Sequence, residues 1–389
     1  MPARHFDVVV AGLGAMGSAT AAHLAMRGRR VLGLDLWAPG HRFGSSHGDS
    51  RIIREMYFEH PMYVPLLQRA HDLWRDLEKR TGTSVMHIIG GLMIGPEDGA
   101  LVSGCLRSAR EHGLEHEIFD ADETARRYPA FGLRDGDVAL LDPRAGYLDP
   151  EAANGAHMKL AELGRAELRF NDGLESWAPD GDGVRVKTTK GESITADKLV
   201  LSTGARTNRY LNGLKLPLEV ERQVVFWLQP DASDSRYDES KFPIWAHEYI
   251  PGEICYGFPR LQRGVKASVM HAGETVDDAD AVNRAVADDE VDPLRKALAG
   301  VLPELSRAAI VESDTCLFTN TPDHNFIIDF HPAHPQVLIS SACSGHGYKF
   351  ASVVGEIQAD LVAEGRAEFD LTPFSLGRAG IGSQVYLRE

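Results

Sequence analysis

The sequence predicts an α/β (α+β) fold with two domains: a Rossmann-like, dinucleotide-binding domain that is discontinuous in the chain, and a second domain built on a mostly antiparallel β-sheet. Three observations predict it. A glycine-rich turn between a strand and a helix opens the chain, strand-like alternation dominates its middle, and a strand, a glycine-rich loop and a helix follow near its end. We expect residues 1–86, 146–218 and 320–389 to form the nucleotide domain, and residues 87–145 and 219–319 to form the second domain.

The opening strand and helix carry a GxGxxG motif. Phe6–Ala11 has the pattern of a buried strand and runs into Gly12, Gly14 and Gly17 before an Ala-rich helix. Gly12 permits the turn, Gly14 lets the backbone approach a pyrophosphate, and Gly17 lets the helix pack closely on the strand. Asp35 ends the next apolar run, at the distance at which an acid meets an adenosine ribose. The motif predicts a dinucleotide site rather than a purely structural turn, but it does not distinguish NAD(P) from FAD, because both place an ADP half on this unit.

The following segments alternate between loop, helix and strand patterns. Gly44–Arg51 is too polar and glycine-rich for a core element and is predicted to be a loop, whereas Leu66–Leu77 has its apolar residues on one helical face. We expect a strand over 85–94 and helices over 97–112 and 121–128.

The nucleotide domain is predicted to resume with a capped helix. Asp149 followed by Pro150 is typical of an N-cap and first helical position, so a helix is expected from here through Leu163. The buried-strand pattern of 194–202 then ends at Gly204, a second close approach of the backbone. The remaining predicted elements are antiparallel strands over 220–310, a strand over 337–341, a glycine-rich loop over 345–349 and a helix over 350–361.

Composition excludes several classes of function. The 389 residues favour two domains, and 43% hydrophobic with 25% charged residues is ordinary for a soluble protein. The net charge of −15 repels phosphate backbones, and no apolar run approaches the ~20 residues that cross a bilayer, so we expect neither nucleic-acid nor membrane partners. The four cysteines are widely spaced, which predicts neither a disulfide framework nor a metal site. Because only Met1–His5 precede the first strand, we expect no signal peptide and a cytoplasmic location.

Several segments together identify a family. Besides the glycine motif, they are Ser45–Arg54, Tyr256–Pro259, Thr315–Cys316, Phe326–Asp329 and Ser344–Phe350. Spread over residues 6–374 in the family's order, they resemble the monomeric sarcosine oxidase and N-methyltryptophan oxidase family of FAD-dependent amine oxidoreductases. The resemblance implies that the dinucleotide is FAD and that the nucleotide domain is an FAD-binding domain.

The resemblance also implies how the cofactor is held. Cys316 matches the cysteine whose thiolate is attached covalently to the 8α carbon of the flavin, whereas Cys105, Cys255 and Cys343 are expected to be core thiols. Besides the glycine motif, Asp35 and Cys316, the residues expected to bind FAD are Ser45, Ser46, His47, Ser50, Arg51, Gly204, Gly345, His346, Gly347 and Lys349.

The resemblance implies that three residues act in catalysis, and a fourth, His247, is expected to join them at the substrate amine. Arg51 matches the arginine beside the flavin, where a cation stabilises the reduced, anionic form. Lys266 matches the lysine implicated in oxygen activation, and Tyr256 matches an aromatic residue of the reaction cavity.

The substrate contacts follow from the same resemblance. Arg54 and Lys349 match the two residues that hold the substrate carboxylate, one through a planar fork and the other through a point charge. Tyr57 matches a second aromatic residue that lines the substrate cavity.

The chain departs from the family near the substrate amine. The family has a histidine four residues after the lysine that matches Lys266, but Met270 stands here. His271 follows at once, although alternation along a strand would turn it to the other face. Counting back from Tyr256 places His247 where the family has a cavity-facing methionine, so we expect His247 to lie in the substrate cavity and to make the polar contact that Met270 cannot.

Two further departures concern the substrate. Arg260 puts a cation where the relatives have a small or neutral residue, and if it faces the cavity it favours a substrate with a second acidic group. Phe318 lacks the hydroxyl that sarcosine oxidase carries two residues after the linking cysteine.

The expected function is therefore an FAD-dependent oxidase of secondary amino acids, N-methyl or cyclic, such as sarcosine. Hydride would pass from the carbon next to nitrogen to flavin N5, and oxygen would reoxidise the flavin to give hydrogen peroxide, with formaldehyde when an N-methyl group is oxidised. The partners expected are an amino acid or amine and molecular oxygen, for a monomer or weak oligomer. A dehydrogenase that uses another acceptor and an inactive flavin-binding protein are the alternatives.

Overall fold

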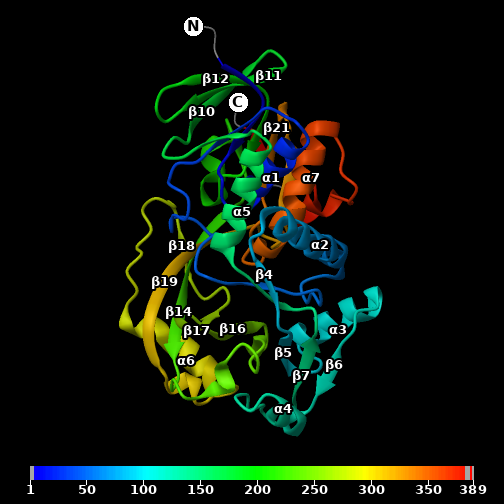
Figure 1. The fold of residues 1–389 in the computed structure, drawn as a ribbon, viewed down its shortest axis with the longest axis vertical. Helices are drawn as coiled ribbons and strands as arrows, with labels where there is room; N and C mark the ends of the chain where they lie inside the picture. The colour runs from blue at the N-terminus through cyan, green and yellow to red at the C-terminus, as the bar shows by residue number, and fades with distance from the viewer. Residues whose placement is uncertain (1–3, 382–385, 388–389) are drawn as a thin grey trace.

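The computed structural model describes residues 4–381 and 386–387, and two large sheets lie along its long axis (Figure 1). The first sheet has eight strands in the order β10-β11-β12-β1-β2-β9, with β21 beside β12 and β20 beside β21. Its central pairs, β1 with β2 and β1 with β12, are parallel, as expected for a nucleotide-binding sheet. The strands are β1 (Arg4–Ala11), β2 (Val31–Leu34), β9 (Glu167–Arg169), β10 (Leu174–Asp180), β11 (Gly183–Thr188), β12 (Ser193–Leu201), β20 (Ile327–His331) and β21 (His334–Ser341).

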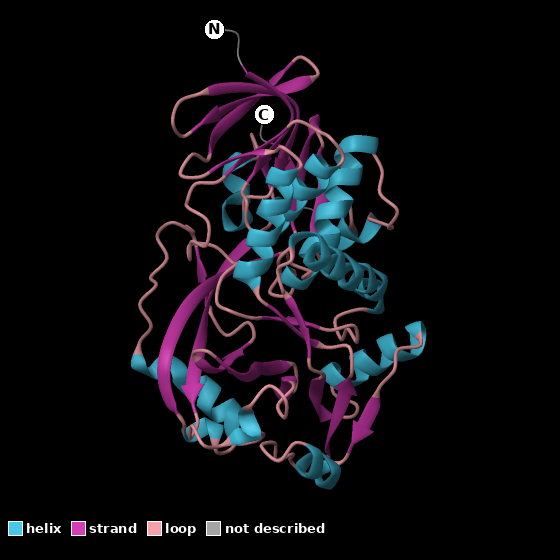
Figure 2. Cartoon of the chain, viewed as in Figure 1, coloured by secondary structure: helices cyan, strands magenta, loops and turns pink. Residues whose placement is uncertain are grey.

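Helices gather over the first sheet (Figure 2). They are α1 (Ala15–Met26), α2 (Val64–Thr81), α5 (Pro150–Leu163) and α7 (Ala351–Glu364). The Ala-rich α1 packs against α5 and α7, and close packing is possible because Gly355 of α7 faces Ala19. The side chain of Asp149 accepts a hydrogen bond from the N–H of Ala152 at 2.8 Å, so α5 begins with the predicted cap.

The second sheet has nine strands in the order β18-β14-β17-β16-β15-β5-β7-β6, with β19 also paired to β14. All of these pairs are antiparallel except β5 with β15. The strands are β5 (Gly91–Pro96), β6 (Glu117–Phe119), β7 (Asp137–Asp142), β14 (Glu219–Gln229), β15 (Ile244–Ile250), β16 (Glu253–Leu261), β17 (Gly264–Val269), β18 (Glu274–Val276) and β19 (Ala309–Asn320). The helices of this half are α3 (Ala100–His112), α4 (Ala121–Arg127) and α6 (Asp292–Ala299).

A three-stranded sheet lies between the two large ones (Figure 1). Its strands are β3 (Arg51–Ile53), β4 (Met86–Ile88) and β8 (Gly146–Leu148), and a short pair joins β13 (Leu214–Lys215) to β22 (Tyr386–Leu387). The single strand expected over 85–94 is divided into β4 and β5, because Gly90 takes a φ of +79° and turns the chain from one sheet into the other. β3 carries Arg51 and ends close to Arg54, which places both residues between the large sheets.

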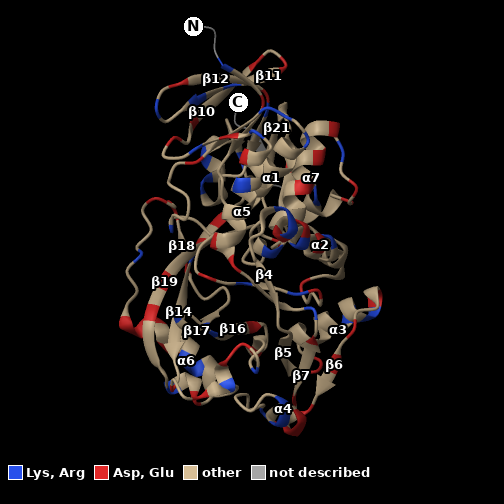
Figure 3. Ribbon diagram, viewed as in Figure 1, with Lys and Arg blue, Asp and Glu red and all other residues tan. Residues whose placement is uncertain are grey.

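The predicted α/β fold is confirmed, with a partly parallel first sheet and a mostly antiparallel second sheet. The first sheet draws its strands from 4–34, 167–201 and 327–341, and the second from 91–142 and 219–320. The exact limits of the two domains stay a prediction. In Figure 3, acidic and basic residues are interspersed over both halves of the chain. Within residues 4–381 and 386–387, no helix has the length and apolar character that crossing a membrane requires.

Candidate active site

At Gly12 and Gly17 the glycine motif forms a turn that only glycine fits. Gly12 has a φ of +89°, and a Cβ there would lie 2.3 Å from the carbonyl oxygen of Ser202. A Cβ at Gly17 would lie 1.8 Å from the Gly12 oxygen, so α1 packs directly on the turn, as predicted. The carboxylate of Asp35 accepts hydrogen bonds from the N–H groups of Leu13 at 2.8 Å and Trp37 at 3.0 Å. Asp35 therefore ties the turn to the end of β2.

One continuous cavity runs from this turn to the second sheet. Of the residues predicted to form the site, those that line it are Gly12, Gly14, Asp35, Ser45, Ser46, His47, Ser50, Arg51, Arg54, Gly204, Tyr256, Lys266, Met270, Cys316, Gly345, His346, Gly347 and Lys349. The part bounded by Arg54, Tyr256, Met270, Phe318 and Lys349 is called the substrate cavity below.

The chemistry of the lining fits a large polar dinucleotide. Ser202, Ser341, Thr319 and His47 line the cavity, and each has a buried side-chain oxygen or nitrogen without a hydrogen-bond partner among the described residues. An unpaired buried polar atom costs roughly 1–3 kcal/mol, so a polar ligand that supplies the missing partners is stabilised here. The N-terminus of α1 adds unpaired N–H groups at the turn.

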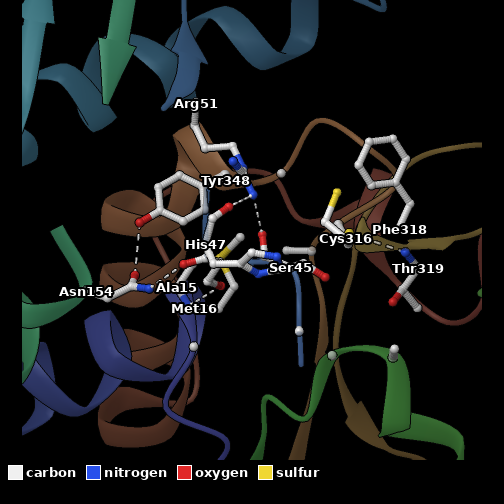
Figure 4. A pocket seen from close by; sticks show the side chains of 18 of the residues that line it. Ala15, Met16, Ser45, His47, Arg51, Asn154, Cys316, Phe318, Thr319 and Tyr348 are labelled. Carbon is white, nitrogen blue, oxygen red and sulfur yellow. Dashed lines mark hydrogen bonds between the residues drawn. The ribbon is translucent and has the colours of Figure 1, made fainter. Parts of the chain in front are cut away.

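The loop before β3 positions Arg51. Ser46 Oγ accepts a hydrogen bond from the N–H of Ala15 at 3.1 Å, and Ser45 Oγ donates to the carbonyl of Leu317 at 2.5 Å. Arg51 donates to three carbonyls of its own loop, and its guanidinium lies 5.7 Å from the ring centre of Tyr348. In Figure 4, Arg51 and Tyr348 lie on one side of the pocket, whereas Cys316, Phe318 and Thr319 lie on the other. The loop thus links the nucleotide turn to β19.

Lys266 on β17 is buried beside this loop. Its Nζ donates hydrogen bonds to the Gly48 carbonyl at 2.6 Å, the Ser50 carbonyl at 2.8 Å and Ser50 Oγ at 3.2 Å. Burial, and then the charge of Arg51, hold the pKa of Lys266 well below its usual range. Three acceptors match the three N–H groups of an ammonium ion and stabilise the charged form of Lys266. Burial and the charge of Arg51 destabilise that form.

Cys316 lies on β19, opposite Gln223 of β14, and its thiol is buried in the cavity wall. Burial raises the pKa of Cys316, whereas the charges of Arg51 and Lys266 act in the opposite direction. The two cations are therefore the groups that would support a thiolate at this position.

Arg54 and Lys349 reach the substrate cavity as predicted, but an acid that the sequence did not reveal joins them. One nitrogen of the Arg54 guanidinium donates to both carboxylate oxygens of Glu59, at 2.9 and 2.7 Å. Although burial opposes the charge, Glu59 raises the pKa of Arg54. Lys349 Nζ donates to the His346 carbonyl at 2.7 Å, and burial, followed by repulsion from Arg54, lowers its pKa to about 7. The only sequence signal for Glu59 is an acid five residues after Arg54.

Tyr57 is buried behind the cavity and does not line it, contrary to expectation. Its hydroxyl hydrogen-bonds to Nδ1 of His346 at 2.6 Å, and its ring packs edge to face against Phe350. The Arg54 guanidinium lies 4.2 Å from the Tyr57 ring centre. The Tyr57 ring therefore packs against the Arg54 guanidinium from outside the cavity.

The prediction that His247 lies in the substrate cavity is wrong. In β15, Ala246 pairs with Tyr256 and His247 pairs with Cys255, so alternation turns Ala246 into the cavity and His247 to the opposite face. His247 is fully buried, with Nε2 3.6 Å from a carboxylate oxygen of Asp137. Burial lowers the pKa of His247 to about 4. Ala246 therefore takes the cavity-facing position expected for His247, because neighbouring residues of a strand face opposite sides.

Of the other two departures, Arg260 lies away from the cavity and Phe318 lines it. Arg260 binds Asp238, at 2.6 Å, and the carbonyls of Asp231 and Asp234, so it holds a surface loop and gives no reason to expect a second acidic group on the substrate. Met270 and Phe318 line the cavity, and His271 packs against Phe318.

Replacing His247 with Met is expected to leave the reductive rate constant unchanged and to alter acid stability instead. The folded pKa of about 4 lies below the ordinary value of 6.5, so this residue costs no stability at pH 7 and progressively more as the pH falls from ~6.5 toward 4. Denaturant unfolding at pH 7 and pH 5 should show that the loss between the two is about 2 kcal/mol smaller in His247→Met. A slower reductive half-reaction at unchanged stability would contradict this placement.

The fold, the glycine turn and the buried basic residues around one cavity define a dinucleotide-dependent redox protein. The chain belongs to the FAD dependent oxidoreductase family, whose sequence profile matches residues 7–361. The cofactor is thus FAD rather than NAD(P), and the family resemblance expected from the sequence is confirmed.

The chain is similar to two named oxidases and to a solved amino acid oxidase structure. The chain is 42% identical to the monomeric sarcosine oxidase of Streptomyces avermitilis, over 92% of this chain and 94% of that protein. It is 36% identical to the N-methyl-L-tryptophan oxidase of Escherichia coli O157:H7, over 96% and 99% of the two chains. Among solved structures, NikD, an unusual amino acid oxidase essential for nikkomycin biosynthesis, matches with a TM-score of 0.83 at 27% identity, covering 96% of this chain and 97% of that one.

Proposed function

We propose that this protein is an FAD-dependent oxidase of secondary amino acids, N-methyl or cyclic, such as sarcosine. The observation that carries the proposal is the convergence of Arg51, Arg54, Lys266 and Lys349 on one cavity that also contains the thiol of Cys316. The relatives named sarcosine oxidase and N-methyl-L-tryptophan oxidase support it. When bound, FAD supplies the acceptor for a hydride from the carbon next to nitrogen, and oxygen then removes the electrons as hydrogen peroxide.

The four basic residues have different roles, which depend on their positions in the cavity. Arg54 and Lys349 bind the substrate carboxylate, because an unpaired buried carboxylate costs several kcal/mol. Lys349 uses one N–H for His346 and keeps others for the substrate. Arg54 has N–H groups beyond those that bind Glu59 and the Met56 carbonyl, and these serve the incoming anion. Arg51 and Lys266 supply positive charge where negative charge develops on the cofactor and on oxygen.

One wall of the cavity is apolar and suits the carbon skeleton of the substrate. The cavity-lining residues that belong to one hydrophobic cluster, or pack against it, are Ile52, Phe58, Ala246, Ile254, Tyr256, Phe258 and Met270. The Arg54 guanidinium lies 4.7 Å from the Phe58 ring centre, so the carboxylate contacts adjoin this wall. A single carboxylate on an otherwise apolar secondary amine matches this arrangement.

A panel of secondary amines read by two assays tests the proposal. Anaerobic addition of sarcosine, N-methyl amino acids and cyclic amino acids should bleach the yellow holoenzyme, and aerobic turnover should release hydrogen peroxide. Formaldehyde should appear with N-methyl substrates. Bleaching with dye reduction but without peroxide would indicate the dehydrogenase, and no bleaching by any amine would indicate an inactive flavin-binding protein.

Carboxylate binding should weaken above pH 7 because of Lys349. The pKa of about 7 in the free enzyme means that Lys349 loses its proton as the pH rises through this value, and with it the charge that binds the anion. We expect the Kd of a carboxylate without an amine, such as benzoate, to rise up to about tenfold per pH unit above 7. Flavin absorption measures this binding, and Lys349→Met should bind weakly at every pH. A Kd independent of pH in the wild type would contradict the assignment.

Arg54→Ala is expected to weaken the same anion by about 2–5 kcal/mol, since the carboxylate is left half-paired in a closed cavity. An amine that lacks a carboxylate serves as the control and should lose much less. Equal losses for both ligands would show that Arg54 has only a structural role.

A further inference from the structure

A polar cluster lies behind one wall of the substrate cavity, and the proposed function does not use it. Its carboxylate, Glu221, is buried, whereas the side chain of His271 is 29% exposed. At its centre, the Glu221 carboxylate accepts hydrogen bonds from His271 Nδ1 at 3.0 Å, Asn320 Nδ2 at 2.8 Å and the Gly273 N–H at 3.1 Å. Gln223 Nε2 also donates to it. Although burial favours the neutral acid, the bonds from His271 and Asn320 lower the pKa of Glu221. Glu221 is therefore an ionised anchor that orients the His271 ring.

His271 in turn packs against the wall itself. Its ring meets the Phe318 ring edge to face, with centroids 5.4 Å apart. A Cβ built on Gly345 would lie 3.0 Å from both Cε1 and Nε2 of His271, and 2.9 Å from the Phe318 ring. Phe318 and Gly345 line the cavity, and the imidazole packs behind them. The φ of +54° at His271, just past the end of β17, departs from strand alternation and so allows Met270 to face the cavity while His271 supports the wall.

The other ties of this wall involve its backbone. The N–H of Ser344 donates to the Thr319 carbonyl at 2.9 Å, and the N–H of Thr319 donates to Cys343 Sγ at 3.3 Å. These bonds hold the glycine-rich loop against β19 but do not hold the Phe318 ring. His271 contacts both the ring and Gly345, and its own position depends on Glu221.

We propose that Glu221 and His271 are a positioning pair that sets the size of the substrate cavity at the Phe318–Gly345 wall and thereby discriminates among substrates by bulk. The inference rests on the proposed function for the identity of the cavity. The His271 ring occupies part of the space behind the Phe318 ring, so shortening His271 gives Phe318 room to retreat and enlarges the cavity. In a hydrophobic pocket, room for one methylene is worth about tenfold or more in discrimination.

The holoenzyme tests this through a ratio of specificity constants. With sarcosine and N-methyl-L-leucine as substrates, His271→Ala should raise the kcat/KM of the larger relative to the smaller by about tenfold, mainly through KM. Glu221→Gln keeps the volume and removes the charge that orients the imidazole, so it should shift the ratio in the same direction by less. It also preserves the test if His271→Ala fails to fold.

A double-mutant cycle shows whether the pair acts through the wall. In a Phe318→Ala background the ring that His271 supports is gone, so His271→Ala should no longer change the ratio. An unchanged ratio in both single variants, or an equal shift with and without Phe318, would overturn the proposal.

A binding series separates this inference from the proposed function. Acetate, isovalerate and benzoate, followed by flavin absorption, report cavity size without turnover, and the variants should gain affinity for the larger anions relative to acetate. If no amine reduces the enzyme, the proposed function fails while this series still tests the wall. A uniform loss for all three anions would show a merely structural role and overturn the positioning role.

Discussion

Replacing Cys316 with serine is expected to release the flavin from denatured protein. In the wild type we propose that the Cys316 thiolate is bonded to the 8α carbon, a bond that replaces one hydrogen of the methyl group while oxygen accepts the two electrons released. Serine cannot form this bond, because an alkoxide is not available near neutral pH. Acid-precipitated wild-type protein should stay yellow, whereas the Cys316→Ser pellet should be colourless and its flavin should appear in the supernatant.

The structure offers a matched control for this experiment. Cys343 lines the same cavity and is half-buried, with its pKa raised by burial, but its Sγ accepts a hydrogen bond from the N–H of Thr319. Cys343→Ser should therefore keep the flavin covalently bound. Yellow pellets from Cys316→Ser, or a colourless wild-type pellet, would remove the assignment, and a colourless pellet from Cys343→Ser alone would transfer it to that residue.

Replacing Lys266 with Met should slow the reaction with oxygen on the order of 100- to 1000-fold and change anaerobic reduction by substrate much less. A positive charge in a water-excluded site is worth most where electrons leave for oxygen and a superoxide-like charge forms. Gly48 and Ser50 hold Nζ of Lys266 in place. The loop of residues 44–54 contains no lysine that could replace it. Stopped-flow measurement of the two half-reactions separates the effects, and equal slowing of both would indicate general damage to the site.

The pH dependence of the oxygen reaction provides a second reading of Lys266. Because burial and Arg51 lower its pKa, the cation is lost at a lower pH than for a lysine in water, and reoxidation should slow as the pH rises through that value. Lys266→Met should abolish this dependence. Lys241→Met, which removes an exposed charge from the same half of the molecule, should retain both the rate and its pH profile.

Motifs whose chemistry is local were predictable from the sequence. Gly12 and Gly17 are required by contacts within one strand, turn and helix, and the Asp149 cap of α5 forms within four residues. Arg51, Lys266 and Cys316 are predicted from the resemblance of their sequence segments to the family, and not from local backbone geometry. The structure brings these three to one cavity.

Side-chain direction was the feature that sequence counting could not supply. Spacing from the short Tyr256 segment predicts His247 in the cavity, but the register of β15 places it on the opposite face. Tyr57 has the spacing of a cavity residue, but its hydroxyl meets His346, which lies 289 positions away in the chain.

The sequence by itself therefore determined the fold class, the dinucleotide turn and the family, because each depends on short-range backbone geometry or on residue types at set spacings. Only the tertiary structure decided that Glu59 pairs with Arg54, that Arg260 serves a surface loop and that Glu221 orients His271 behind Phe318. These contacts depend on strand register and on the packing of distant segments. Because the side-chain period of a strand is two residues, the smallest error in register reverses which residues meet.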